Sequence, residues 1–296
     1  EDAAVEATCT TDGLSAGKHC SVCGAVLAAQ EVVPALGHDE AYESAGKCGR
    51  CGAVNPDKAA AKIGEDYYLT LSEAIAKAKD GNTVVLLQDT SESGINIPDS
   101  LKSKGVTLDL NGKTLSASST IFDVYGKLYI QNSGDAATGS VTSSDRAFYL
   151  NSGSTVTLRT GVAVHSNDRP IMVEPRATLT VAKGASVEGD PDEYNPGSVI
   201  TCQGTVKIQS GSTVTGHGYD SVITVDGGKL SMIGGTVEQT GLAGAAIETK
   251  SGAVVTINGT AAVIKATNEK VCPSGNPGIA AISMTGGGTV EIKNGK

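Results

Sequence analysis

The chain has 296 residues, of which 38 are glycine, none is tryptophan and only 3% are aromatic. This length allows two domains, and the composition suits a narrow aliphatic core with many tight turns. The net charge of −9 argues against a nucleic-acid partner or an anionic membrane surface. No apolar run is long enough for a transmembrane helix, so no membrane span is expected in this chain.

Residues 1–57 are predicted to be a small Cys-rich domain. Five of the seven cysteines lie within the first 51 residues, which marks a domain boundary soon after them. The segment has little hydrophobic periodicity and is too short to build a good apolar core. We therefore expect a metal ion or disulfides to hold it together.

Two Cys-x-x-Cys-Gly motifs in this segment indicate a structural zinc site. In such a turn both thiolates reach one tetrahedral ion, and the glycine lets backbone amides approach sulfur. Two motifs separated by 24 residues favour a zinc ribbon. The predicted ligands are Cys20, Cys23, Cys48 and Cys51. Cys9 and His38 are alternative ligands, and disulfide pairing of the cysteines also stays open.

Residues 58–296 are predicted to form the second domain, which begins with a cap at about 63–90. A helix is expected over 70–81, with Thr70 or Ser72 as its N-cap. Its apolar stripe would consist of Leu71, Ile75 and Ala78. An amphipathic helix here would cover the otherwise open end of a solenoid core.

From about residue 147 to residue 292 the chain repeats a short apolar pair every 23 to 35 residues. The pairs are Val156-x-Leu158, Leu179-x-Val181, Val206-x-Ile208, Leu230-x-Met232, Val255-x-Ile257 and Val290-x-Ile292. Another apolar pair precedes most of them by about six residues. A third apolar position follows about six residues later, at Val164, Val187, Val214, Val237 and Val263.

This repeat predicts an all-β fold, a single-stranded parallel β-helix. Alternation at period two argues against helical repeats, and glycine, asparagine, serine and aspartate between the segments provide turns. The recurrence of one equivalent middle strand argues against a β-sandwich. Each coil would bury one residue in two by stacking on its neighbours.

Two stretches resemble known families. Residues 7–38, with Cys20-Ser-Val-Cys23-Gly at their centre, resemble Cys-rich modules of large secreted and cell-wall proteins of gut Firmicutes. Residues 63–89, followed by the sequence VTLDLNGKTL from Val106, are similar to the opening of pectate-lyase-like right-handed β-helices in the same proteins. The resemblance covers most of the chain and implies a right-handed coil and an extracellular, cell-surface location. The abrupt ends of the sequence suggest a fragment of a larger protein.

The resemblance does not imply an activity, because such β-helices include lyases, hydrolases, adhesins and non-catalytic stalks. A lyase needs clustered acidic calcium ligands beside a basic residue, and a hydrolase several aspartates on adjacent turns. We find neither pattern and expect no catalysis. His165 and His217 are expected to be surface or turn residues, and Cys202 a small buried one. A loop at 189–197 offers a calcium site through Asp190, Asp192 and Glu193.

The predicted function is adhesion or carbohydrate binding without catalysis, with a polysaccharide or a host or bacterial surface glycan as partner. Tyr125, Tyr129 and Tyr149 fall in adjacent coils, where they can stack on sugars. A rigid spacer of a larger surface protein is the alternative, and a polysaccharide lyase or hydrolase is the second alternative. A binder should show a concave patch that joins these tyrosines to a long loop, whereas a spacer should not.

Overall fold

The computed structural model describes residues 1–135, 138–190, 197–241, 243–267 and 280–294. It divides the chain into two compact units. The first unit comprises Glu1–Ala59 with Tyr67–Leu69, and the second comprises Ala60–Asp66 with Thr70–Lys296.

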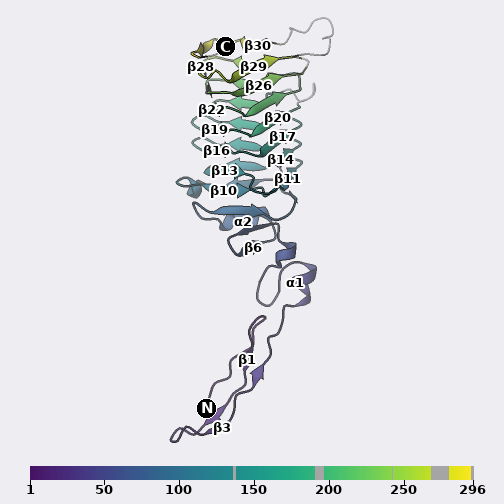
Figure 1. The fold of residues 1–296 in the computed structure, drawn as a ribbon, viewed down its shortest axis with the longest axis vertical. Helices are drawn as coiled ribbons and strands as arrows, with labels where there is room; N and C mark the ends of the chain where they lie inside the picture. Colours follow the sequence, from purple (N-terminus) through teal and green to yellow (C-terminus); the bar gives the residue numbers. More distant parts are fainter. Residues whose placement is uncertain (136–137, 191–196, 242, 268–279, 295–296) are drawn as a thin grey trace. The chain divides into compact units, whose positions relative to one another are not determined.

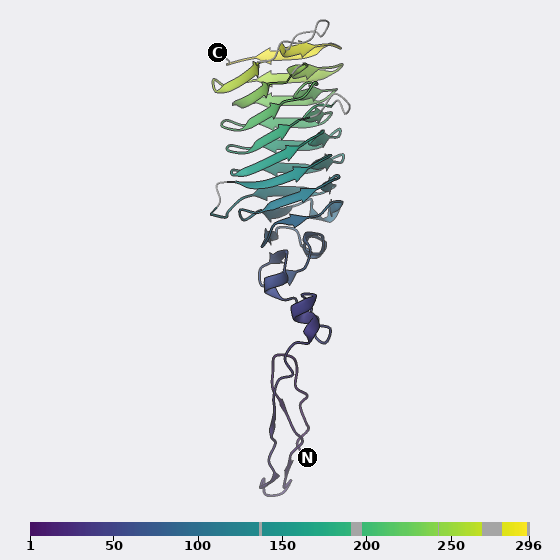
Figure 2. The ribbon, with the colours of Figure 1, turned by 90° about the vertical axis from the view of Figure 1, so that its right-hand side faces the viewer.

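The second unit is a parallel β-helix, which confirms the predicted fold class (Figures 1 and 2). Its coils contribute strands to three sheets, named here by their members. Sheet 1 contains β7 (Thr83–Leu86), β10 (Val106–Asp109), β13 (Lys127–Gln131), β16 (Thr155–Leu158), β19 (Thr178–Val181), β22 (Thr205–Ile208), β25 (Lys229–Met232), β28 (Ala253–Ile257) and β31 (Gly288–Ile292). Sheet 2 contains β8 (Thr90–Ser91), β11 (Thr114–Ala117), β14 (Gly139–Ser143), β17 (Val162–Ser166), β20 (Ser186–Gly189), β23 (Thr213–Gly216), β26 (Gly235–Gln239) and β29 (Ala262–Ala266). Sheet 3 contains β9 (Ile95–Ile97), β12 (Phe122–Val124), β15 (Phe148–Leu150), β18 (Ile171–Val173), β21 (Ile200–Cys202), β24 (Ile223–Val225), β27 (Ala245–Thr249) and β30 (Ala280–Met284).

The core of the β-helix follows from the alternation in the sequence. Strands of the inner coils bury every second side chain, so equivalent aliphatic residues lie in register from coil to coil. Phe122 pairs with Phe148, and their rings stack with centroids 5.2 Å apart. One predicted inward position is wrong. Val263 pairs with Thr236, and Ile264 is the residue that pairs with the inward Val237, a shift of one residue.

A helix, α2 (Leu71–Lys77), lies against β5 (Ala61–Ile63), β7 and β9, as expected of a cap. The Thr70 hydroxyl accepts a hydrogen bond from the Glu73 amide at 3.1 Å, which confirms Thr70 as the N-cap. The helix ends four residues before the predicted end. Its buried residues are Leu71, Ala74 and Ile75, with Ala74 in the place expected for Ala78.

Shorter elements precede or follow the first strands of the β-helix, and one of them, β6, has its last two residues, Tyr67 and Tyr68, in the first unit. Strand β5 pairs antiparallel with β7, and a short 3₁₀ helix, η2 (Asp99–Leu101), follows β9. Strand β6 (Asp66–Tyr68) lies between β5 and α2 in the sequence.

The first unit contains little regular structure. Its elements are β1 (Gly13–Leu14), β2 (Lys18–His19), β3 (Val26–Ala28), β4 (Val32–Val33), α1 (Glu40–Ser44) and the 3₁₀ helix η1 (Pro56–Lys58). Strands β1 and β4 pair antiparallel, as do β2 and β3. Within Glu1–Ala59, which the structure describes throughout, the only buried hydrophobic residues are Cys9, Cys48 and Ala59. This unit therefore lacks the apolar core that a domain of its size needs.

Candidate metal centre and candidate ligand-binding site

Three cysteines and one histidine of the first unit form a cluster with the composition of a metal site. The ligand atoms of Cys9, His38, Cys48 and Cys51, called the metal cluster below, all lie within 4.8 Å of one another. The Sγ atoms of Cys9 and Cys48 are 3.8 Å apart, and Cys51 Sγ lies 3.4 Å from His38 Nδ1. Tetrahedral zinc with ordinary bond lengths would separate its ligand atoms by about 3.5–3.8 Å. These two separations match tetrahedral zinc, and three cysteines with one histidine are a donor set that zinc uses.

Local backbone structure explains the position of Cys48 and Cys51. The amide of Cys48 bonds to the Ala53 carbonyl, and the amide of Gly52 returns to the Cys48 carbonyl at 2.8 Å. Gly52 has φ of 74°, which favours glycine. His38 is oriented by Tyr42 of α1, because the two rings stack with centroids 4.0 Å apart.

The thiols of the cluster differ in acidity. The pKa of Cys48 falls to about 6, because burial, which raises it, is outweighed by backbone amides of Asp39 and Cys51 and by the His38 side chain. Burial raises the pKa of Cys9 to about 11, with further contributions from the neighbouring Cys51 and Cys48. Since zinc binds thiolates, Cys48 is better prepared to bind it than Cys9.

The other Cys-x-x-Cys-Gly motif, called a knuckle below like the one at Cys48 and Cys51, has the same turn but lies outside the metal cluster. Cys20 and Gly24 repeat the pattern, with the Cys20 amide bonded to Ala25 and the Gly24 amide bonded to Cys20, each at 2.8 Å. Cys20 is half-buried and Cys23 exposed. Backbone amides of Cys23 and Val22 lower the pKa of Cys20.

The structure thus brings two of the four predicted ligands, Cys48 and Cys51, together with both alternative ligands, Cys9 and His38. It does not assemble the four-cysteine set. Cys9, Cys20, Cys23, Cys48, Cys51 and Cys202 are free thiols, so none of them forms the disulfides that the sequence left open. The remaining cysteine, Cys272, lies outside the described residues.

The three candidate tyrosines lie on two different sheets. Tyr129 is on sheet 1, where the Arg159 guanidinium lies 4.4 Å from its ring centroid. Tyr125, 44% exposed, follows β12 of sheet 3. Tyr149 is on β15 of sheet 3 and lines a depression. Asp190 is exposed after β20, whereas Asp192 and Glu193 lie outside the described residues.

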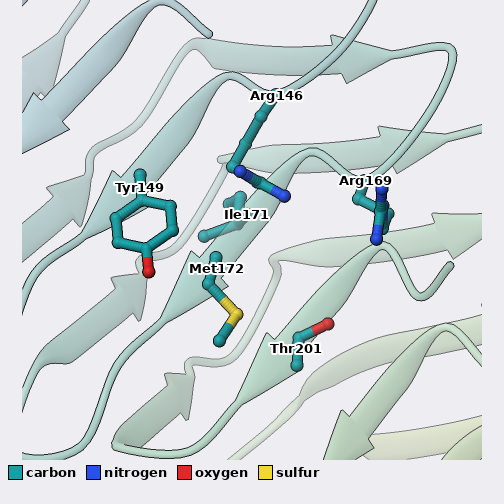
Figure 3. A pocket seen from close by; sticks show the side chains of 6 residues that line it. All are labelled: Arg146, Tyr149, Arg169, Ile171, Met172 and Thr201. Atoms are coloured by element: carbon teal, nitrogen blue, oxygen red, sulfur yellow. The ribbon is translucent and has the colours of Figure 1, made fainter.

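The depression beside Tyr149 has a volume of about 300 Å³ (Figure 3). It is called the Arg–Tyr depression below. Its lining consists of Arg146, Tyr149, Arg169, Ile171, Met172 and Thr201.

Polar contacts fix the Tyr149 side chain. Its hydroxyl donates a hydrogen bond of 2.6 Å to Glu174, and the Arg146 guanidinium lies 5.4 Å from the ring centroid. The bond to Glu174 is the main reason that the pKa of Tyr149 is raised, with burial second. The ring is thus held in place, with an arginine beside it.

A second depression, also of about 300 Å³, is lined by two carboxylates, Asp220 and Glu248. Burial raises the pKa of Asp220, and the negative charge of Glu248 adds to this. Glu248 accepts hydrogen bonds from Thr224 and Thr285 at 3.1 and 2.9 Å. Hydrogen bonds thus hold one member of the carboxylate pair in place.

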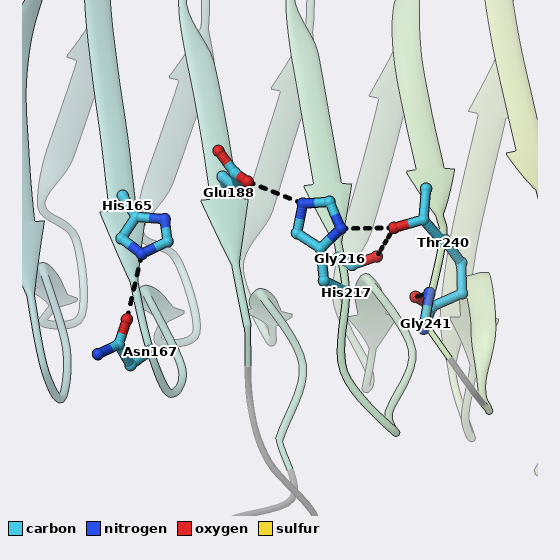
Figure 4. Close-up of polar contacts among 8 residues, drawn as sticks. His165, Asn167, Glu188, Gly216, His217, Thr240 and Gly241 are labelled. Carbon is cyan, nitrogen blue, oxygen red and sulfur yellow. Dashed lines mark hydrogen bonds and ion pairs between the residues drawn. The ribbon is translucent and has the colours of Figure 1, made fainter. Parts of the chain in front are cut away.

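The two histidines of the β-helix lie on the surface, and both have hydrogen-bond partners (Figure 4). His217 contacts Glu188 at 2.8 Å and the Thr240 hydroxyl at 2.5 Å. His165 contacts Asn167 at 3.1 Å. The His217 contacts link consecutive coils, since Glu188, His217 and Thr240 lie in or directly after β20, β23 and β26.

The inward Cys202 behaves as expected for a small buried residue. It is fully buried, and burial raises its pKa to about 12. Its thiol is therefore protonated at neutral pH and unsuited to nucleophilic chemistry.

Comparison with protein-family models, with curated proteins and with solved structures gives no match for this chain. In the described part of the chain, no helix has the length and apolarity needed to cross a bilayer.

Proposed function

We propose that this chain is a glycan-binding module of a cell-surface protein, without catalysis of its own. The Arg–Tyr depression is the observation that carries the proposal. Sugars present apolar C–H faces together with many hydroxyl groups, and a concave site with one aromatic ring and a few polar groups suits them. Here Tyr149 supplies the ring, Met172 adds apolar surface, and the arginines and Thr201 supply hydrogen-bonding groups.

The cell-surface location rests on the resemblance of residues 7–38 and 63–115 to secreted modules. In this proposal the first unit holds one structural zinc ion through the metal cluster. The match between the cluster distances and tetrahedral zinc supports this role. Zinc binding would supply the folding free energy that the first unit cannot obtain from an apolar core.

Binding to a panel of plant, mucin and bacterial-wall glycans tests the proposal. Tyr149→Ala should raise the dissociation constant for a retained glycan about tenfold, because one stacking ring is lost. Tyr129→Ala is the matched control, because Tyr129 also lies beside an arginine but belongs to sheet 1.

Other outcomes would contradict the proposal in distinct ways. A loss with Tyr129→Ala alone would place binding on sheet 1. Absence of retention on every glycan would leave the rigid spacer. If the native chain cleaves a glycan and Asp220→Asn abolishes the cleavage, the result would favour a polysaccharide lyase or hydrolase acting at the second depression.

A further inference from the structure

Two arginines border the Arg–Tyr depression because of the register of the β-helix. Phe148 of β15 pairs with Ile171 of β18, and each of these residues follows an arginine by two positions. Arg146 and Arg169 therefore occupy equivalent positions on consecutive coils, which lie about 4.8 Å apart where their strands pair. Figure 3 shows both side chains at the same depression.

Arg146 is half-buried, and one of its guanidinium nitrogens lacks an acceptor. Its Nε atom is buried and has no hydrogen-bond partner. Among the described residues Arg146 forms no ion pair. An unsatisfied buried donor is unfavourable, more so when it carries charge. A ligand that brings an anionic oxygen into the depression would pair with the guanidinium charge of Arg146.

The two arginines differ in their acidic neighbours: Asp168 is paired with Arg169, whereas no carboxylate among the described residues is paired with Arg146. Asp168 lies 3.3 Å from Arg169 Nε, and Glu174 accepts the Tyr149 hydroxyl. Asp123 pairs with Tyr149 in register but does not line the depression. Among the described residues, the two arginines are the only charged ones in its lining.

The dimensions of the site limit its occupant. A volume of about 300 Å³ lies at the small end of ligand sites, which suits one sugar ring of a longer chain. A planar guanidinium matches the geometry of a carboxylate through two parallel hydrogen bonds.

We infer that the Arg–Tyr depression recognises a sugar residue that carries a carboxylate, with Arg146 as its principal donor. Arg169, which is paired with Asp168, contributes further N–H donors, and the Tyr149 ring contacts the face of the sugar. The inference rests on the proposed glycan binding and specifies its ligand class. Uronic and sialic acids share the required group.

The test uses oligosaccharides that contain glucuronate, galacturonate or sialate, each paired with its carboxyl-reduced neutral form. Dextran sulfate is included as a general polyanion. The full chain should bind at least one acidic member at least tenfold more tightly than its reduced form. Arg146→Gln should abolish that difference, whereas Arg146→Lys should retain part of it. Arg159→Gln is the matched control, because Arg159 also lies over a tyrosine but belongs to sheet 1.

Each contrary result has one meaning. Equal binding of acidic and reduced forms would overturn the carboxylate inference and leave glycan binding intact. No binding of any oligosaccharide would overturn both. Equal binding of dextran sulfate, with equal losses in Arg146→Gln and Arg159→Gln, would show general charge attraction instead of a site.

Discussion

Asp109 is a buried carboxylate with all the donors it needs. Its side chain, in a residue only 4% exposed, accepts hydrogen bonds from the amides of Asn111 and Ser133, both at 3.0 Å. It also accepts from the Gln131 side chain at 2.9 Å and from the Ser133 hydroxyl at 2.6 Å. These bonds join β10 to the following coil. Burial raises the pKa of Asp109, but the donors outweigh burial and the pKa falls below its ordinary value.

Asp109→Asn should lower the free energy of unfolding by about 1–3 kcal/mol at neutral pH, because the amide would replace charge-assisted bonds and meet donors with its own NH₂ group. Denaturant unfolding would measure this, with the exposed Asp66→Asn as control. Since the folded pKa is lowered, the stabilisation is complete above the unfolded pKa of about 4 and is lost as the pH falls through the folded pKa. A difference between Asp109→Asn and the native chain that stays constant from pH 7 to pH 2 would contradict this account.

At the scale of an element, the helix α2 depends on a side chain from outside it. The Glu92 carboxylate accepts hydrogen bonds from the Leu71 and Ser72 amides at 2.6 and 2.9 Å, and from the Ser72 hydroxyl at 2.7 Å. These amides lie in the first turn, where the backbone has no internal acceptors. A negative charge there is also favoured by the helix dipole.

Glu92→Ala should destabilise the cap by about 1–2 kcal/mol, since two first-turn amides lose their acceptor. The loss should show as faster amide hydrogen exchange in Leu71–Lys77. Glu73→Ala serves as control, because it removes another first-turn acid whose side chain is exposed. Equal exchange in the native chain and in Glu92→Ala would refute the role of Glu92.

Much of this cap could be predicted from sequence, but its end and its support could not. Amphipathic spacing and Thr70 located the helix correctly. The early end follows contacts from the next coil: Asp80 accepts hydrogen bonds from the Lys104 and Gly105 amides, which fixes the backbone after Lys77 in another conformation. Such a tertiary contact has no local signal, and neither has the one-residue shift at Val263.

At the scale of the whole chain, the two units should respond differently to metal removal. The β-helix buries its own core, whereas the first unit has almost no buried apolar residues to replace a lost ion. A chelator should therefore abolish hydrogen-exchange protection in Glu1–Ala59 and leave sheets 1 to 3 protected.

Single cysteine substitutions should show which side chains hold the zinc ion. The native chain should bind one zinc ion, Cys51→Ser should lose it, and the matched Cys23→Ser should keep it, as measured by metal analysis. Loss of zinc in Cys23→Ser would instead support the four-cysteine set of both knuckles.

The sites were harder to predict than the fold for one physical reason. Periodicity reports which residues face inward, and it identified the β-helix from sequence. A site depends on which distant residues meet. The knuckle motif identified Cys48 and Cys51 but could not show that Cys9 and His38, rather than Cys20 and Cys23, approach them. Tyr149 was a candidate from sequence, but the adjacent arginines became visible only through the register of β15 and β18.

The parallel register also has a mechanical consequence. Each inner coil of the β-helix is bonded only to the coil before it and the coil after it, and Phe148 lies 23 residues from its partner Ile171. Tension applied along the chain from one end would therefore load the hydrogen bonds of a single coil at a time. Each coil that detaches would release about 75 Å of extended chain. We therefore expect such a chain to yield to force one coil at a time, in steps that vary with the length of each coil, while the remaining coils stay folded.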